Sequence, residues 1–329
     1  MERISLRDKI ASARFLLKYK RHEQFRFYRN ENQVLRLGND FLHPMCFSFY
    51  VSTNENLYYY SKLKLEGKDV LVPTASGDHA FNAIYYGAKS VETFDINAFA
   101  ALQYDLKETA IKCLSRDEFI EFYTVENFFN LQTYIKLRPF LKDDTRIFFD
   151  EIYSFIARNP GEKNVFYPLV EEYFMQDKSI IRRNPYLKNE RTFADMKRKL
   201  LKLETPVKHK LCPVHELDSY FDKKDIVILS NILSYYYSNT YRSDEYLDKF
   251  EISLSSIERL LRPTGIASVL YLFNYHKTPN STEMRDEIST HASERNVSEI
   301  DVKNIFCEDD NVHTDKIIIM RKPDTIIIK

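Results

Sequence analysis

Several features that the chain lacks narrow its class. It has no net formal charge, with 48 basic and 48 acidic residues, so we expect no bulk attraction to nucleic acid or to an anionic membrane. No run of about 18 apolar residues occurs, and the N-terminal MERISLRDKI lacks the apolar core of a signal sequence. Tryptophan is absent, although Tyr and Phe are plentiful. In a chain of 329 residues these features predict a soluble globular protein with a substantial core.

The cysteines and histidines form no metal-binding pattern. The four cysteines are scattered along the chain, at Cys46, Cys113, Cys212 and Cys307. The eight histidines form no HxxxH or HExxH motif, so we expect no metal site. Scattered cysteines without a paired framework are typical of a reducing compartment, and we expect a cytoplasmic location.

The strongest structural signal lies between Asp69 and Asn97, in the stretch DVLVPTASGDHAFNAIYYGAKSVETFDIN. It predicts a strand around Val70–Val72, a turn at Thr74–Asp78, a helix over His79–Tyr86 and a second strand at Val91–Phe94. In doubly wound sheets, ligands bind outside the carboxyl ends of the strands, where helix N-termini face them. We therefore expect a binding site at this turn and at the end of the second strand.

The composition of the turn favours a cofactor without phosphate. Its single glycine, Gly77, does not meet the G-x-G-x-x-G pattern of a dinucleotide site, and no P-loop motif occurs in the chain. Asp95 follows the second strand about 20 residues beyond the turn, where a carboxylate accepts both ribose hydroxyls. S-adenosylmethionine carries ribose and adenine but no phosphate, and is the predicted cofactor. In the alternative interpretation Gly77 only shapes the turn and Asp95 only caps the next helix.

Strands and helices alternate through much of the remaining chain. A helix with a buried face is predicted over Ala98–Leu114, and Ser115 with Glu118 forms a capping box for the helix after it. Further strands are expected at Val207–Cys212, Asp225–Leu229 and Ile266–Phe273, and a C-terminal edge hairpin at Lys316–Met320 with Thr325–Ile328. A helix through Phe250 and Leu260 is expected to end at Arg262–Gly265. The fold class is therefore α/β: a Rossmann-like class I methyltransferase fold with a mostly parallel sheet and an antiparallel C-terminal hairpin.

Two regions lie outside this alternation. Residues 1–65 are predicted to be an N-terminal helical segment, and residues 66–329 a cofactor-binding domain with a helical insertion at about 124–205. The basic and aromatic stretch Arg14 to Arg29 is predicted to pack its aromatic side chains on the sheet. Contact of this stretch with a membrane surface or a nucleic acid is the alternative, although no clear nucleic-acid partner is indicated.

The motifs of the core resemble those of a known family. They are SGD-x-x-x-N at the first turn, FDIN after the second strand, L-K-x-x-A-I in the following helix and LSN-I-L at Leu229–Leu233. In these, the chain resembles the BtaA-type 3-amino-3-carboxypropyl transferases, which use S-adenosylmethionine. The strongly similar part covers about 60 residues. The resemblance implies an S-adenosylmethionine-dependent transferase acting on a small-molecule, lipid or peptide-linked acceptor.

Positions in this framework assign candidate site residues. Ser76, Gly77 and Asp78 are expected to line the methionine part of the cofactor, with Asp78 near its ammonium. Asp95 is expected at the ribose, Ile96 and Asn97 beside the adenine, and Val214, within Pro213–His215, near the adenine edge. Ser230 and Asn231 are expected to close over the sulfonium. The predicted cofactor-binding set is Ala75, Ser76, Gly77, Asp78, Asp95, Ile96, Asn97, Val214, Ser230 and Asn231.

Asn231 and Tyr235 are the candidate catalytic residues, because they follow the strand that leads into the site. Tyr235, Tyr236 and Tyr237 are candidates to orient an acceptor, and packing under the insertion is the alternative role. Three functions remain open at this stage. They are transfer of the 3-amino-3-carboxypropyl group, methylation of a small molecule, and non-catalytic binding on a degenerate transferase fold.

Overall fold

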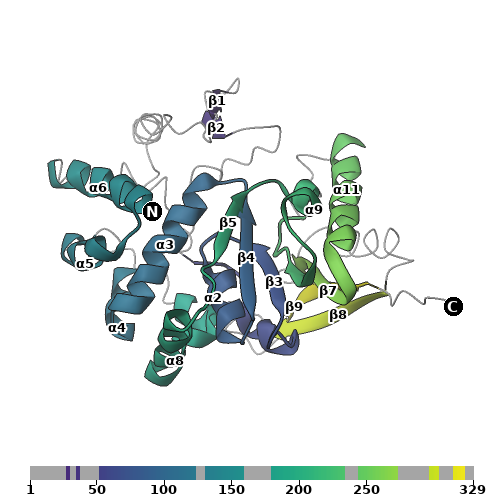
Figure 1. Cartoon of the computed structure of the whole chain (residues 1–329), viewed down its shortest axis with the longest axis horizontal. Coiled ribbons are helices and arrows are strands. Elements are labelled where there is room, and N and C mark those ends of the chain that lie inside the picture. Colours follow the sequence, from purple (N-terminus) through teal and green to yellow (C-terminus); the bar gives the residue numbers. More distant parts are fainter. Residues whose placement is uncertain are drawn as a thin grey trace.

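A seven-stranded sheet forms the centre of the computed structural model (Figure 1). The structure describes residues 27–29, 35–37, 52–123, 130–158, 179–233, 244–272, 296–303 and 314–322. The strands of the sheet are β3 (Asp69–Pro73), β4 (Ser90–Asp95), β5 (Lys208–Leu211), β6 (Lys224–Ile228), β7 (Leu261–Leu272), β8 (Asn296–Lys303) and β9 (Thr314–Arg321). A separate two-stranded sheet pairs β1 (Phe27–Arg29) with β2 (Leu35–Leu37).

The strands lie in the order β5-β4-β3-β6-β7-β9-β8. The five strands from β3 to β7 are parallel to one another, whereas β9 is antiparallel to both β7 and β8. The chain thus adds β4 and β5 outward from β3 on one side, and then β6 and β7 on the other side, where β9 lies between β7 and the edge strand β8. This order confirms the predicted Rossmann-like class I fold with an antiparallel C-terminal hairpin.

Helices cover both faces of the sheet, so the central strands are apolar on both sides (Figure 1). Val70 and Val72 of β3 pack into one buried cluster, and Leu71 between them packs into the other. The same alternation divides β6, where Ile226, Val227 and Ile228 are all buried. The continuous apolar runs in the sequence therefore do correspond to central parallel strands.

One face carries most of the helices, including those of the region 124–205. They are α2 (Asp78–Tyr85), α3 (Ala98–Cys113), α4 (Arg116–Phe122), α5 (Leu131–Leu137), α6 (Asp143–Arg158), α7 (Ser179–Arg183) and α8 (Glu190–Leu201), with the 3-10 helices η2 (Leu57–Lys62), η3 (Arg138–Phe140) and η7 (Pro185–Leu187). The other face carries η8 (Val214–Glu216), α9 (Leu217–Tyr220) and α11 (Asp244–Leu260). Within 130–158 and 179–205 the described elements are all helical. The division of the chain at residue 65 and at 124–205 stays a prediction.

Helix ends follow local capping chemistry. The Ser115 side chain accepts a hydrogen bond from the amide of Glu118, whose carboxylate accepts one from the amide of Ser115. This confirms the predicted capping box at the start of α4. Asn97 caps α3 in a similar way, since its side-chain oxygen accepts from the amide of Phe99 at 3.0 Å.

Three sequence-based expectations need correction. The partner of β9 is β8, not the predicted Thr325–Ile328, which lies outside the described residues. The β8 sequence NVSEIDVK has few apolar residues to mark it as a strand. Strand β7 begins at Leu261 instead of Ile266 because Thr264, at φ 63°, makes an irregularity within the strand instead of a turn before it.

The third correction concerns residues 1–65, which we expected to be helical. Their described parts contain β1, β2 and the 3-10 helix η2. The stretch Arg14 to Arg29 lies outside the described residues except for Phe27–Arg29, which are strand. Aromatic residues such as Phe27 and Tyr28 favour strands, which the helical prediction for this stretch did not take into account. None of the helices in the described parts of the chain has the length and apolarity needed to cross a bilayer.

Candidate active site

The candidate site lies where the strand order reverses, between β3 and β6. At such a reversal the loops after the two strands diverge, and ligands of open α/β sheets bind in the crevice between them. The loop after β3 contains Ala75 at φ 39°, and the loop after β6 contains Ser230 at φ 61°. Non-glycine residues in this region are strained, and such strain concentrates at functional sites. Both strained residues of the two loops were predicted to bind the cofactor.

The turn after β3 requires glycine at position 77. Gly77 has φ 83°, and a Cβ there would lie 2.8 Å from a ring carbon of Phe81 and 3.3 Å from one of Tyr104. Its amide donates to the carbonyl of Thr74 at 2.6 Å, which closes the turn, and α2 begins at the next residue. Ser76 is fully buried inside the turn. The turn is therefore a tightly enclosed piece of backbone with one conformation.

Asp95 connects two loops at the carboxyl edge of the sheet. One carboxylate oxygen accepts from the amide of Ala75 at 2.8 Å, and the other accepts from the amide of Asn97 at 2.9 Å. Burial raises the pKa of Asp95 to about 6, despite these amide hydrogen bonds, which favour the ionised form. A carboxylate offers about four acceptor positions, so room for further donors remains. The cap of α3 is Asn97, not Asp95 as in the alternative interpretation, and the role of Asp95 at a ribose stays a prediction.

An exposed apolar side chain follows Asp95. Ile96 is 39 % exposed at the edge of the sheet, whereas Asn97 beside it is buried and caps α3. An apolar surface next to a carboxylate suits an adenine base next to a ribose. Val214 is buried in η8, on the face of the sheet that α11 covers. The roles of these residues in binding stay predictions.

Asp78, which was predicted to lie near the ammonium of the cofactor, already has a cation of the protein as its partner. Its carboxylate is fully buried and lies 2.5 Å from the Nζ atom of Lys107. It also accepts hydrogen bonds from the hydroxyls of Tyr186 and Ser52 and from the amide of Thr53. Burial alone would raise the pKa of Asp78, but Lys107 outweighs that effect and holds it below its usual value. Asp78 is therefore an internal support of the turn, already paired with a cation.

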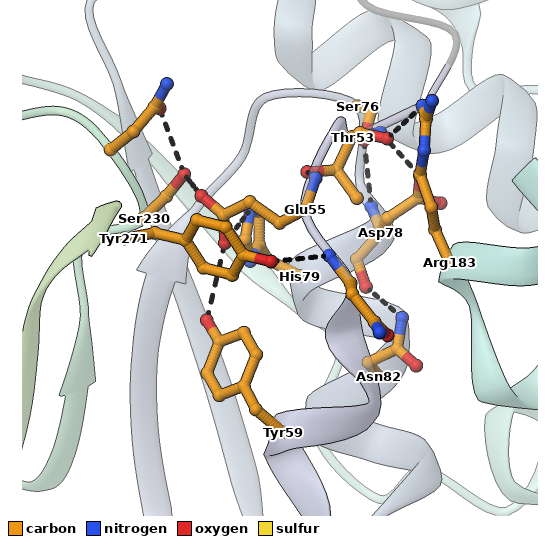
Figure 2. Close-up of polar contacts among 12 residues, drawn as sticks. Thr53, Glu55, Tyr59, Ser76, Asp78, His79, Asn82, Arg183, Ser230 and Tyr271 are labelled. Atoms are coloured by element: carbon orange, nitrogen blue, oxygen red, sulfur yellow. Dashed lines mark hydrogen bonds and ion pairs between the residues drawn. The ribbon is translucent and has the colours of Figure 1, made fainter. Parts of the chain in front are cut away.

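A second buried carboxylate lies at the reversal point, and sequence reasoning missed it. Glu55 comes from the segment 52–56, and its carboxylate accepts a short hydrogen bond from the hydroxyl of Ser230 (Figure 2). Its other oxygen lies 3.5 Å from the hydroxyl of Tyr59 and 3.9 Å from Nε2 of His79. Burial raises the pKa of Glu55 to about 8. Burial also lowers the pKa of His79 to about 4, so at pH 7 this ring is neutral.

The residues around Glu55 come from both halves of the sheet. Nδ1 of His79, on α2, lies 2.8 Å from the hydroxyl of Tyr60. The hydroxyl of Tyr271, at the end of β7, donates to Asp315 of β9 at 2.5 Å and accepts from the amide of Asn56 at 3.2 Å. The segment 52–56 thus bridges the loops after β3 and β6 and the C-terminal strands.

The helices of the region 124–205 reach this site through polar contacts. The guanidinium of Arg183, on α7, donates to the carbonyl of Thr53 at 2.8 Å, as Figure 2 shows. The side-chain amide of Asn82 donates to the carbonyl of Asp78 and to the side-chain oxygen of Asn184, each at 2.8 Å. These contacts fix the segment 52–56 and the start of α2 against the same helices.

Most of the predicted site residues meet at one edge of the sheet. Ala75, Ser76, Gly77, Asp78, Asp95, Ile96 and Asn97 lie in the loops after β3 and β4, and Ser230 and Asn231 in the loop after β6. The side-chain oxygen of Asn231 lies 3.2 Å from the hydroxyl oxygen of Ser230. Tyr235, Tyr236 and Tyr237 lie outside the described residues. Among the described residues, no group of three or more His, Cys, Asp or Glu side chains could hold a metal ion.

Of the missed residues, Lys107 left a signal in the sequence. It lies three and four positions before Ala110 and Ile111, on the apolar face of the predicted helix. A charge on a buried face needs an ion-pair partner. Glu55 left no such signal, because STNEN reads as an ordinary polar loop.

Comparisons with known proteins find only solved structures of low similarity. No family model and no curated protein matches the chain. Solved structures that resemble it include the N-methyltransferase NodS from Bradyrhizobium japonicum in complex with S-adenosyl-L-homocysteine, at 8 % identity and a TM-score of 0.39, covering 82 % of this chain and 84 % of that one. A SAM-dependent methyltransferase from Methanosarcina mazei has 12 % identity and a TM-score of 0.37, with 81 % and 98 % covered. An rRNA methylase from Streptococcus thermophilus has 8 % identity and a TM-score of 0.35, with 82 % and 94 % covered. Because these TM-scores are low, the assignment of the fold rests on the strand order alone.

Proposed function

We propose that the protein is an S-adenosylmethionine-dependent transferase. The observation that carries the proposal is the contact of Asp95, at the end of β4, with Ala75, in the loop after β3. The Asp95 carboxylate is fixed by the amide of the turn after β3, and the exposed Ile96 follows it. A carboxylate with free acceptor positions suits a ribose, and the adjoining apolar side chain suits an adenine. The turn that would face a phosphate has one glycine, which favours a cofactor without phosphate.

The group transferred is proposed to be 3-amino-3-carboxypropyl. A nucleophile of the acceptor attacks the γ-carbon of the methionine part, the bond from that carbon to sulfur breaks, and its electron pair stays on sulfur. The products are methylthioadenosine and the alkylated acceptor, whose displaced proton passes to a base. Positioning of the two reactants in line supplies much of the rate in such a displacement. Asn231 and Tyr235 are proposed to orient the acceptor, which is a small-molecule, lipid or peptide-linked group.

The contacts of the motif residues support this finer proposal. The motif SGD-x-x-x-N and the L-K pair are far apart in the sequence, yet they form one network. Nζ of Lys107 donates to the carbonyl of Ser76 at 3.2 Å as well as to Asp78, and Asn82 donates to the carbonyl of Asp78. Residues that carry the resemblance thus act together on one turn of the site. Methyl transfer uses the same fold and cofactor, and is the alternative.

The products distinguish these two reactions. Incubation with S-adenosylmethionine and candidate acceptors should release methylthioadenosine, identified by mass spectrometry. Release of S-adenosylhomocysteine alone would establish methyl transfer instead. Binding of cofactor with neither product, across acceptors of each class, would favour the non-catalytic alternative.

Cofactor binding itself is tested by calorimetry on the Asp95→Ala variant. Removing a partly buried carboxylate that accepts two ribose hydroxyls should weaken S-adenosylmethionine binding by about 10- to 100-fold. The matched control is Asp222→Ala. Asp222 is exposed and precedes β6, so it lies at the amino-terminal ends of the strands, away from the candidate site. Equal affinity of wild type and Asp95→Ala would contradict the proposal.

A further inference from the structure

Two buried carboxylates near the reversal point, those of Asp78 and Glu55, differ in whether a cation neutralises their charge. Asp78 is paired with Lys107 at 2.5 Å, so its charge is neutralised inside the protein. Glu55 accepts hydrogen bonds from Ser230 and Tyr59, but no lysine or arginine of the described residues forms an ion pair with it. Nε2 of His79 lies 3.9 Å from its carboxylate. A buried carboxylate without a cation is costly to ionise, so its surroundings are incomplete for the charged form.

The position of Glu55 matches the part of the cofactor that carries a cation. Its carboxylate is held by Ser230, in the loop after β6, and lies against His79, on α2 after the turn. Asp95, proposed to bind the ribose, lies at the end of the neighbouring strand β4. A cofactor that places its ribose at Asp95 extends its methionine part toward the gap between β3 and β6. The ammonium of that part then approaches the segment 52–56.

We propose that Glu55 is the carboxylate that receives the α-ammonium of the cofactor's methionine part. The inference rests on the proposed function and replaces the earlier assignment of that contact to Asp78. Glu55 is fully buried, so this contact requires the loop around Ser230 or the segment 52–56 to shift. The backbone of Ser230 is strained, at φ 61°, so a shift of the loop after β6 would relieve this strain.

A change of protonation accompanies this contact. Titratable groups face Glu55 from each element packed against it: Tyr59 and Tyr60 of η2, His79 of α2, Tyr271 of β7 and Asp315 of β9. Burial, with a smaller contribution from Asp315, raises the pKa of Glu55 to about 8, so the free protein holds a proton there at pH 7. An ammonium beside the carboxylate favours its ionised form, so binding expels the proton. Methylthioadenosine lacks the ammonium and leaves the proton in place.

Calorimetry with two ligands tests the proposal. S-adenosylhomocysteine carries the amino-acid part and methylthioadenosine does not, whereas both carry the ribose and adenine. Titrations at pH 7 in buffers of different ionisation enthalpy count the protons released. The wild type should release close to one proton more with S-adenosylhomocysteine than with methylthioadenosine. Equal proton release with the two ligands would overturn the proposal, and this result needs no variant.

The Glu55→Gln variant supplies the second measurement. Glutamine keeps an acceptor for Ser230 but has no charge, so S-adenosylhomocysteine should bind about 10- to 100-fold more weakly while methylthioadenosine binds as before. The control is Glu92→Gln, the same chemical change at a residue paired with Lys224 near the opposite edge of the sheet. Unchanged affinity for S-adenosylhomocysteine, or equal weakening of both ligands, would overturn the role of Glu55. Failure of the wild type to bind either ligand would overturn the proposed function itself.

Discussion

At the scale of single residues, the site combines carboxylates of opposite character. Asp78 is buried with a cation and its pKa is lowered, whereas Glu55 is buried with no lysine or arginine of the described residues beside it, and its pKa is raised to about 8. Asp95 lies between these cases, with amide donors and a pKa raised to about 6 by burial. Environment, not residue type, thus sets the direction in which the pKa of each carboxylate shifts.

Glu55 makes the stability of the folded protein depend on pH. Its pKa rises from 4.5 to about 8 on folding, so the folded state binds its proton more tightly. The resulting stabilisation is complete below about pH 4.5 and is lost as the pH rises through about 8. Glutamine has no proton to lose. The stability of Glu55→Gln relative to wild type should therefore increase between these two pH values, by an unfolding free energy on the order of a few kcal/mol. The Tm of the variant should rise relative to that of wild type over the same range.

Thermal unfolding followed by circular dichroism over this pH range measures the difference. The Glu92→Gln variant reports the pH dependence common to the rest of the chain. A Tm difference between Glu55→Gln and wild type that stays flat across the range would contradict the burial of an uncompensated Glu55.

At the scale of elements, helix α3 is bound to the turn after β3 through one buried ion pair. Lys107 of α3 is fully buried and donates both to Asp78 and to the carbonyl of Ser76. Replacing Lys107 by Met would leave the Asp78 charge buried without a cation. We expect a loss of about 3–5 kcal/mol in unfolding free energy, measured by urea denaturation.

The double variant Lys107→Met with Asp78→Asn separates charge from packing. It removes both charges at once, so it should recover part of the stability that the single Lys107→Met variant loses. The exposed pair of Lys136 and Glu118 provides the control, since Lys136→Met should change stability by less than about 1 kcal/mol. A double variant less stable than Lys107→Met alone would show that the ion pair is not the cause.

The sequence predicted those elements that have a clear pattern of apolar residues. Strands β3, β4 and β6 were predicted to within one or two residues because their apolar runs are bounded by turns. Strand β8 was missed because NVSEIDVK, on the edge of the sheet, is mostly polar. The irregularity at Thr264 was read as a turn, since Pro-Thr-Gly typically ends an element, whereas pairing with β6 holds the backbone in the strand.

At the scale of the whole molecule, the site is made by contacts between distant parts of the chain. The loops after β3 and β4 were predictable because one local unit supplies them. Glu55 and Ser230, in contrast, are 175 positions apart, and nothing local to either residue indicates the other. Arg183 reaches Thr53 over 130 positions. Such contacts depend on the order of strands and on how the region 124–205 packs, which local patterns do not determine.

This arrangement predicts where a bound cofactor protects the backbone. A ligand held only by the local unit around Asp95 would slow amide hydrogen exchange only in the loops after β3 and β4. A ligand that occupies the reversal point should slow exchange together in three separate segments: 52–56, 74–78 and 229–233. Hydrogen–deuterium exchange with mass spectrometry, with and without S-adenosylhomocysteine, measures this directly.

The edge strand β8 supplies the internal control, because three strands, β6, β7 and β9, separate it from β3. Its exchange should not change on binding, since the proposed cofactor contacts lie at the ends of β3, β4 and β6. Protection confined to residues 74–97 would mean that the segment 52–56 is a structural cover and not part of the binding site. In wild type, all three segments should be protected. If Glu55→Gln loses protection only at 52–56, the contribution of that segment to binding comes from the carboxylate of Glu55.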